Sequence, residues 1–182
     1  MSLYTFGVLT AAWVGWTAPF FLIKQKGGKP QTLDRRARWG IFLQGIAYFI
    51  VWQPTFWAPS RASWRLPVAL VFLIMGPLIS WTSARTLGRQ WRFDAGLNAD
   101  HQLIRSGAYR FIRHPIYASM MCMLIGTGIL LTRLAFLPIA VILFVAGAEI
   151  RIRIEDALLA SRFGDEFREY QRKVPAYLPL IR

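Results

Sequence analysis

Long uncharged stretches alternate with basic ones along this chain, and the pattern predicts five membrane-spanning helices. A span needs roughly 20 mostly apolar residues, and the shortest spans have about 17. Five stretches of the sequence approach or meet this length. They are residues 3–23, 40–58, 66–84, 116–132 and 134–150. We therefore expect an all-α integral membrane protein.

The last two apolar stretches are separated only by Arg133, and Glu149 near the end of the second is their one acidic residue. This spacing predicts a tight helical hairpin, and a re-entrant hairpin that does not cross the bilayer is the alternative. The first stretch lacks a preceding basic residue and is too long for the apolar region of a signal peptide. We therefore interpret it as a membrane span.

Basic residues gather in alternate connecting segments. If the five helices cross in turn, 19 Lys and Arg residues lie on one side of the membrane and 3 on the other. The side rich in basic residues faces the cytoplasm in membrane proteins. We expect the N-terminus outside and the C-terminus in the cytoplasm. Arg outnumbers Lys by 18 to 4, which favours a bacterial source and thus the bacterial inner membrane.

The composition agrees with a membrane protein. Of the 182 residues, 55% are hydrophobic and 17% are charged, whereas soluble domains have about 25% charged residues. The net charge of +13 follows from the topology and from attraction to anionic lipids, so we expect no nucleic-acid partner. Cys122 is the only cysteine. An internal disulfide is therefore excluded, a cysteine-based zinc site is disfavoured, and we expect no metal.

Polar residues that could perform chemistry occur in two segments on the same expected membrane side. The first, residues 85–117, contains both histidines, His101 and His114. Pro115 disfavours a helical conformation at His114 and suits the first turn of a helix. His114 then lies at a helix N-terminus, where free backbone N–H groups favour anionic ligands. The alternative is an ordinary turn with a solvated imidazole.

The second polar segment, residues 149–179, continues the fifth apolar helix. Arg151 and Glu155 are four residues apart and share a helix face, although an ordinary salt bridge would explain this pair equally well. The pair Phe163–Gly164 predicts a helix end, and residues 165–173 form a short charged helix that Pro175 follows. We expect one structural domain, with a three-helix scaffold over residues 1–84 and the chemistry in residues 85–182.

Several motifs in the second half resemble those of the isoprenylcysteine carboxyl methyltransferase family. Arg113-His114-Pro115-Ile116-Tyr117 resembles its RHPxY signature, and Glu155-Asp156-Ala157-Leu158-Leu159 resembles its EExxL element. The remaining matches are Leu87-Gly88-Arg89-Gln90-Trp91, Gly107-Ala108-Tyr109-Arg110, Phe163-Gly164-Asp165-Glu166-Phe167 with Tyr170, Val174-Pro175 and Leu178-Pro179. Their order along about half of the chain makes the resemblance specific.

The sequence departs from the family pattern at four positions. They are Asp156 for the second Glu, Ser119 for a Gly, Ala108 for a Pro and Phe167 for a Tyr. These changes leave the expected methyl donor unaffected, but they weaken the expectation that the acceptor is a prenylated protein.

The resemblance implies an integral membrane methyltransferase that uses S-adenosylmethionine, with its cofactor pocket open to the cytosol. It implies an acceptor that enters from the lipid, either an isoprenylcysteine-like carboxylate, a lipid or a small hydrophobic compound. The expected cofactor-binding residues are His101, Tyr109, His114, Pro115, Tyr117, Glu155 and Tyr170. The expected catalytic residues are Arg151, Arg153 and Glu155. Either arginine could orient Glu155 or bind an acceptor carboxylate.

Two other functions remain open. One is an NADPH-dependent membrane reductase of the sterol reductase-like type, because those enzymes are distantly similar to the same half of the chain. The other is a membrane module without enzymatic activity, which would require ionisable groups facing a pore within the spans. Of the five apolar stretches, only residues 134–150 contain an acidic residue.

Overall fold

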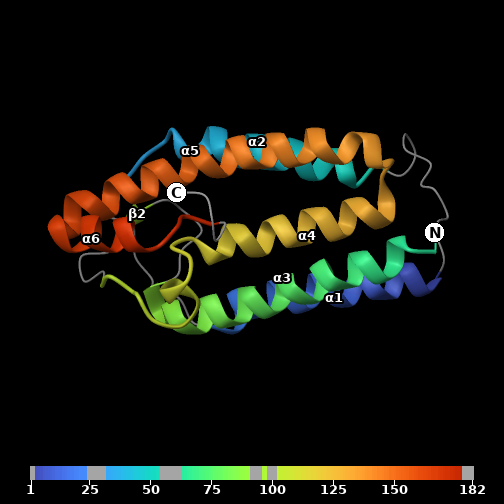
Figure 1. Cartoon of the computed structure of the whole chain (residues 1–182), viewed down its shortest axis with the longest axis horizontal. Coiled ribbons are helices and arrows are strands. Elements are labelled where there is room, and N and C mark those ends of the chain that lie inside the picture. Colours follow the sequence, from blue (N-terminus) through green and yellow to red (C-terminus); the bar gives the residue numbers. More distant parts are fainter. Residues whose placement is uncertain (1–2, 24–31, 54–62, 91–95, 98–101, 178–182) are drawn as a thin grey trace.

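The computed structural model describes residues 3–23, 32–53, 63–90, 96–97 and 102–177, which form an elongated bundle of helices (Figure 1). The helices are α1 (Leu3–Leu22), α2 (Ala37–Val51), α3 (Arg65–Leu87), α4 (Pro115–Leu131), α5 (Leu137–Phe163) and α6 (Asp165–Lys173). Three short 3₁₀ turns also occur: η1 (Gly88–Gln90), η2 (Gly107–Arg110) and η3 (Leu134–Phe136).

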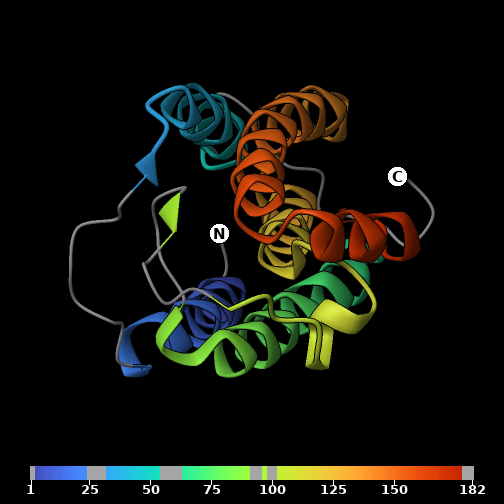
Figure 2. The same cartoon turned by 90° about the vertical axis from the view of Figure 1, so that its left-hand side faces the viewer.

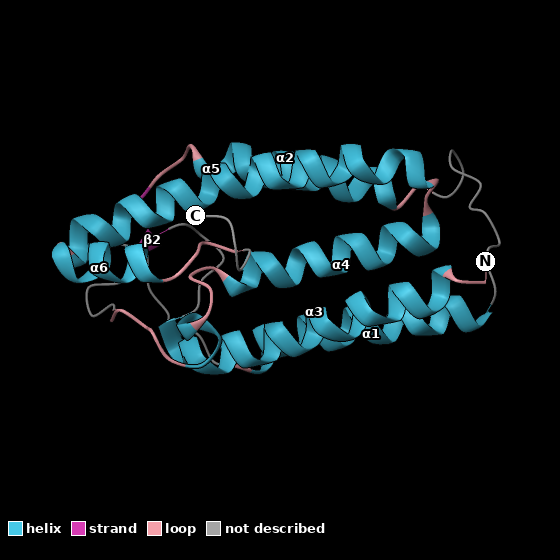
Figure 3. Cartoon of the chain, in the orientation of Figure 1, coloured by secondary structure: helices cyan, strands magenta, loops and turns pink. Residues whose placement is uncertain are grey.

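The two strands are short. β1 (Thr32–Leu33) pairs antiparallel with β2 (Gly96–Leu97) and joins the segments before α2 and after α3. Most of the described chain is helical (Figure 3), and the predicted all-α fold is confirmed apart from this pairing.

The predicted apolar segments correspond to the five long helices. Helices α1, α3 and the continuous helical stretch 134–163 are long and apolar enough to cross a membrane, and α2 and α4 are shorter apolar helices. A multi-pass membrane protein is therefore the appropriate description. Residues 132–136 make the tight turn that the sequence predicts between the last two segments. However, α4 packs mainly on α3 and α5 mainly on α2 (Figures 1 and 2).

One helix boundary differs from the prediction. Helix α2 ends at Val51 rather than near residue 58. We infer that Pro54 is the reason, because proline disfavours a helical conformation in the residue before it. Pro54 itself lies outside the described residues. Helix α5 continues past its apolar part and ends at Phe163, as the Phe163–Gly164 pair predicts. Pro77 lies inside α3, which continues through it to Leu87.

Aromatic side chains of α1 fasten this helix to α4. The indole N–H of Trp16 donates to Oγ of Ser119 at 3.0 Å, and that of Trp13 donates to Oγ1 of Thr127 at 3.2 Å. Side-chain hydrogen bonds of this kind contribute to helix association in lipid, where the hydrophobic effect does not act between helices. Ser119, one of the departures from the family pattern, therefore has a structural partner.

Glycines bring α2 and α5 into close contact. A Cβ added to Gly40 would lie 2.5 Å from the backbone oxygen of Gly147, and one added to Gly147 would lie 2.6 Å from the backbone oxygen of Gly40. Small residues at helix crossings allow such approach in membranes. The crossing matters for function because Arg151, one turn after Gly147, also lies against Gly40.

We predict that Gly40→Ala lowers the stability of the purified protein in detergent by about 1 to 3 kcal/mol, because the new methyl group forces α2 away from α5. Gly45→Ala is the matched control, since it lies on the same helix with open space around its Cβ position. Thermal unfolding of both variants tests this. Equal unfolding temperatures for the two would contradict the close crossing.

Candidate functional site

The site begins at the N-terminus of α4. His114 has a non-helical backbone (φ −125°, ψ 63°), and Pro115 occupies the first helical turn, as the sequence predicts. The backbone N–H of Arg113 donates to the oxygen of Pro175 at 2.9 Å, and that of His114 donates to the oxygen of Ala176 at 2.7 Å. The chain after α6 therefore runs beside the segment that enters α4 and holds it in place.

The second part of the site comes from the polar end of α5. This helix ends at Gly164, whose φ of 54° is a left-handed conformation that glycine adopts easily. Helix α6 follows at once, with Asp165 and Glu166 in its first turn and basic residues in its last, the arrangement that the helix dipole favours. The turn carries α6 back toward the start of α4.

The imidazole of His114 joins the two parts. Its Nε2 lies 2.8 Å from Oδ1 of Asp156, and its Nδ1 lies 3.3 Å from Oε2 of Glu155. His114 is only 7% exposed. Both ring nitrogens therefore face carboxylates in a site with little water.

Arg113 extends the contact to α6. One of its terminal nitrogens donates to Oδ2 of Asp156 at 2.9 Å, and the other donates to the backbone oxygens of Gln171 and Val174. The side chain of Gln171 also donates to Asp156, at 3.1 Å. Asp156 thus binds three side chains at the junction of α4, α5 and α6.

Glu155 lies on the inner side of this junction. The hydroxyl of Tyr117 donates to its Oε1 at 2.5 Å, and a terminal nitrogen of Arg151 is 3.7 Å from the same oxygen. The Arg151 guanidinium also lies over the Tyr117 ring, 5.4 Å from its centroid. The Arg151–Glu155 pair expected from the sequence is therefore present, and Tyr117 completes it.

Burial of His114 would by itself lower its pKa. The hydrogen bonds to Asp156 and Glu155 outweigh that effect and raise the pKa of His114 to about 9, so the imidazole is charged at neutral pH. We define Arg113, His114, Tyr117, Arg151, Glu155 and Asp156 as the polar cluster. It contains three cations (Arg113, His114 and Arg151) and two carboxylates (Glu155 and Asp156), so it has one excess positive charge.

The structure brings together His114, Pro115, Tyr117, Arg151 and Glu155 among the predicted site residues. Tyr109 and Tyr170 lie beside the cluster, where the hydroxyl of Tyr170 donates to the backbone oxygen of Tyr109 at 2.5 Å. His101 lies outside the described residues.

Arg153 requires a correction. Its side chain is 77% exposed and pairs with Glu149 at 2.8 Å, away from Glu155. Two residues along an α-helix correspond to a rotation of about 200°, so Arg151 and Arg153 cannot share a face. The structure therefore leaves Arg151 as the arginine of α5 in the cluster.

The expected site residues also omitted Arg113, Asp156 and Gln171. Arg113 and Asp156 belong to the motifs that resemble the family pattern, but neither is among the expected site residues. The sequence signal for these two residues is their position directly beside His114 and Glu155, because neighbours of a functional residue at a helix end often orient it.

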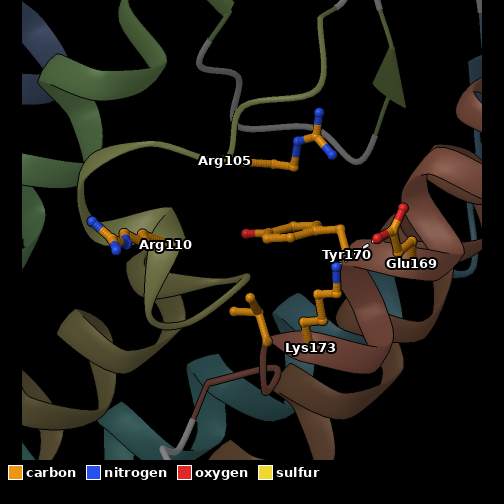
Figure 4. A pocket seen from close by; sticks show the side chains of 6 residues that line it. Arg105, Arg110, Glu169, Tyr170 and Lys173 are labelled. Atoms are coloured by element: carbon orange, nitrogen blue, oxygen red, sulfur yellow. Dashed lines mark hydrogen bonds and ion pairs between the residues drawn. The ribbon is translucent and has the colours of Figure 1, made fainter.

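A small hollow of about 140 Å³ lies near Tyr170. Arg105 and Arg110 line it from the segment before α4, and Glu169 and Lys173 line it from α6 (Figure 4). Lys173 pairs with Glu169, and Arg105 pairs with Glu166 at 2.6 Å. Within the described residues, no group of His, Cys, Asp and Glu side chains is arranged to hold a metal ion.

Known proteins share this half of the chain. The profile of the isoprenylcysteine carboxyl methyltransferase (ICMT) family matches residues 69–161, about half of the chain, including α4 and most of α5. The chain belongs to this family. The matched region contains every residue of the polar cluster, and the resemblance noted in the sequence is confirmed.

Two relatives illustrate the breadth of the similarity. The protein-S-isoprenylcysteine O-methyltransferase of Schizosaccharomyces pombe is 33% identical over 116 residues, which are 62% of this chain and 49% of that protein. The cobalt-zinc-cadmium resistance protein CzcN of Cupriavidus metallidurans is 33% identical over 121 residues, 65% of this chain and 53% of that protein.

A solved structure is also similar. The eukaryotic intramembrane Ras methyltransferase ICMT superposes with a TM-score of 0.58 at 26% identity, covering 78% of this chain and 51% of that one. The chain thus spans about half the length of the ICMT relatives cited here. The shared architecture extends beyond the matched profile.

We predict that the protein loses stability as the pH rises from about 6.5 to about 9. The raised pKa of His114 means that its charged form is stabilised by folding, so this contribution is complete below pH 6.5 and absent above pH 9. It amounts to about 3 kcal/mol. Thermal unfolding in detergent across this range measures it.

His114→Gln is the control, because glutamine cannot titrate in this range. The variant should be less stable at pH 6.5 and should lose little more by pH 9.5. An equally steep decline in the variant would assign the pH dependence to other groups.

Proposed function

We propose that this protein is a membrane methyltransferase that uses S-adenosylmethionine to methylate a carboxylate on a lipophilic acceptor. The observation that carries the proposal is the polar cluster, which lies at the N-terminus of α4 and within the region shared with the ICMT family. Family membership supports the reaction class, and the charges of the cluster support the acceptor class.

The polar cluster suits the methyl donor because it offers groups for both of its charged ends. Nε of Arg113 is buried and has no hydrogen-bond partner among the described residues, so it can donate to a carboxylate. Glu155 is 24% exposed at its side chain and can accept from an ammonium group or ribose hydroxyls. We assign His114, Pro115, Tyr117 and Glu155 to this site, with Tyr109 and Tyr170 beside it.

The chemistry requires little from the protein beyond positioning. When bound, S-adenosylmethionine supplies a methyl group on a sulfonium centre. Transfer of that methyl group to a carboxylate oxygen would leave the C–S electron pair on sulfur and would require no proton transfer by the protein. The task of the residues is to hold the reacting atoms in line and exclude water.

Arg151 is the residue that we assign to the acceptor. It lies over Tyr117 and beside Glu155, and a guanidinium binds a carboxylate with two parallel hydrogen bonds. A carboxyl group is ionised at neutral pH because its ordinary pKa is about 4, so no general base is needed. An amine acceptor would need one, and the excess positive charge of the cluster disfavours it.

The orientation of the chain belongs to the same proposal. With the C-terminus in the cytoplasm, the polar cluster faces the compartment that supplies the methyl donor. The bacterial inner membrane is the proposed location, and the acceptor would enter from the surrounding lipid.

We predict that Glu155→Gln weakens binding of the product S-adenosylhomocysteine roughly ten- to hundredfold, because one charge-assisted hydrogen bond of about 1.5 to 3 kcal/mol is lost. Isothermal titration calorimetry of the purified protein measures this affinity.

Glu149→Gln is the matched control. It removes a carboxylate from the same helix, but that carboxylate pairs with the exposed Arg153, so the affinity should stay within about twofold. If Glu155→Gln binds as tightly as the natural protein, the donor site lies elsewhere.

A further inference from the structure

An unpaired polar side chain lies inside the bundle, outside the polar cluster. Gln44 of α2 is 3% exposed, and among the described residues its amide nitrogen Nε2 has no hydrogen-bond partner. A buried donor without a partner costs free energy, and the cost is greater in a medium of low dielectric constant. The amide therefore indicates a ligand that supplies the missing acceptor atom.

The contacts of α2 place Gln44 at the depth of Tyr117. Val51 lies against Gly128 of α4, and the hydroxyl of Tyr48 donates to the backbone oxygen of Met120 at 2.8 Å. Helices α2 and α4 therefore run in the same direction. One turn before Tyr48, Gln44 is level with the first turn of α4, which carries Tyr117.

On its other side, Gln44 touches α5. A Cβ on Gly147 would be 3.0 Å from Cγ of Gln44. Gly147, Arg151 and Glu155 follow one another at intervals of four residues and share one face of α5. Along the α5 axis, Glu155 of the proposed donor site lies about 12 Å from Gly147, which contacts Gln44. Arg151 lies halfway between Gly147 and Glu155.

We propose that Gln44 and Arg151 together bind the anionic end of the methyl acceptor, with Gln44 selecting a carboxylate over neutral or cationic groups. This inference rests on the proposed function and adds a specificity residue to it. The amide N–H and the guanidinium both donate hydrogen bonds, and a carboxylate accepts from both. An ammonium group only donates, so it would leave Gln44 unpaired and would be repelled by Arg151.

The position of Gln44 in the chain suits a specificity residue. The ICMT profile begins at residue 69, so α2 lies outside the matched region while Arg151 and Glu155 lie inside it. Helix α2 can therefore vary in acceptor recognition while the donor site is retained.

The test compares Gln44→Met with the natural protein. The probes are an N-acylated S-farnesylcysteine and its methyl ester, in which a methyl group removes the negative charge of the carboxylate. We expect the natural protein to bind the acid at least tenfold more tightly than the ester. The variant should show a clearly smaller preference, because Arg151 remains while methionine has a similar shape but no N–H group. Titration followed by tryptophan fluorescence measures both affinities.

A second measurement separates recognition from a purely structural role. Removing an unpaired buried amide should leave the ligand-free unfolding temperature of Gln44→Met unchanged or raised, whereas a structural glutamine would give a lower one. Thr127→Val is the control, because it leaves the indole N–H of Trp13 unpaired. That variant should be less stable and should keep the preference for the acid.

An undiminished preference in Gln44→Met, or no preference in the natural protein, would overturn the inference about Gln44. Failure of the proposed function would give a different result. The natural protein would then transfer no labelled methyl group from S-adenosylmethionine to the acid. Because binding of the acid and the ester is read without catalysis, the two failures are distinguishable.

Discussion

The contact between His114 and the adjacent carboxylates Glu155 and Asp156 joins the two halves of the bundle's polar end. Helix α4 belongs mainly with α3, and α5 with α2, so this buried contact fixes the start of α4 against the polar end of α5. Charges in such a site are tolerated only when each is paired, because desolvation is costly and an unpaired charge costs several kcal/mol. Arg113 meets that requirement for Asp156 and at the same time holds the end of α6. The position of every polar group in the cluster therefore follows from one set of ionic contacts.

Those contacts divide the work between the two adjacent carboxylates. Asp156 is enclosed by Arg113, His114 and Gln171 and serves the structure. Glu155 is more exposed and faces Tyr117 and Arg151, which suits a group that exchanges partners when a ligand binds. The shorter Asp in place of the family's second Glu fits this division, because Asp156 only has to reach side chains already packed against α5.

Local signals in the sequence predicted much of this arrangement. Pro115 marks the start of α4 because proline restricts the backbone conformation. The Phe163–Gly164 pair marks the end of α5 because glycine adopts left-handed conformations easily. The spacing of Arg151 and Glu155 predicted their contact because residues four apart share one face of a helix. The pairing of Arg113 with Asp156, and the burial of Gln44 against Gly147, join residues that are 43 and 103 positions apart. Such contacts depend on how the helices cross, which local periodicity does not specify. The prediction for Arg153 was wrong because a residue two positions after Arg151 lies on a different face of the helix, where Arg153 pairs with Glu149.

The central claim is that the polar cluster supports methyl transfer to a carboxylate, and the chemical nature of the product tests it most directly. Membranes containing the protein would be incubated with S-adenosylmethionine labelled in its methyl group, and the lipophilic products would then be treated with mild alkali. A methyl ester is hydrolysed under these conditions, so the account predicts that the label is released as volatile methanol. Label that stays bound to the lipophilic fraction, as an N-methyl or S-methyl group would, contradicts the account, and so does the absence of any label.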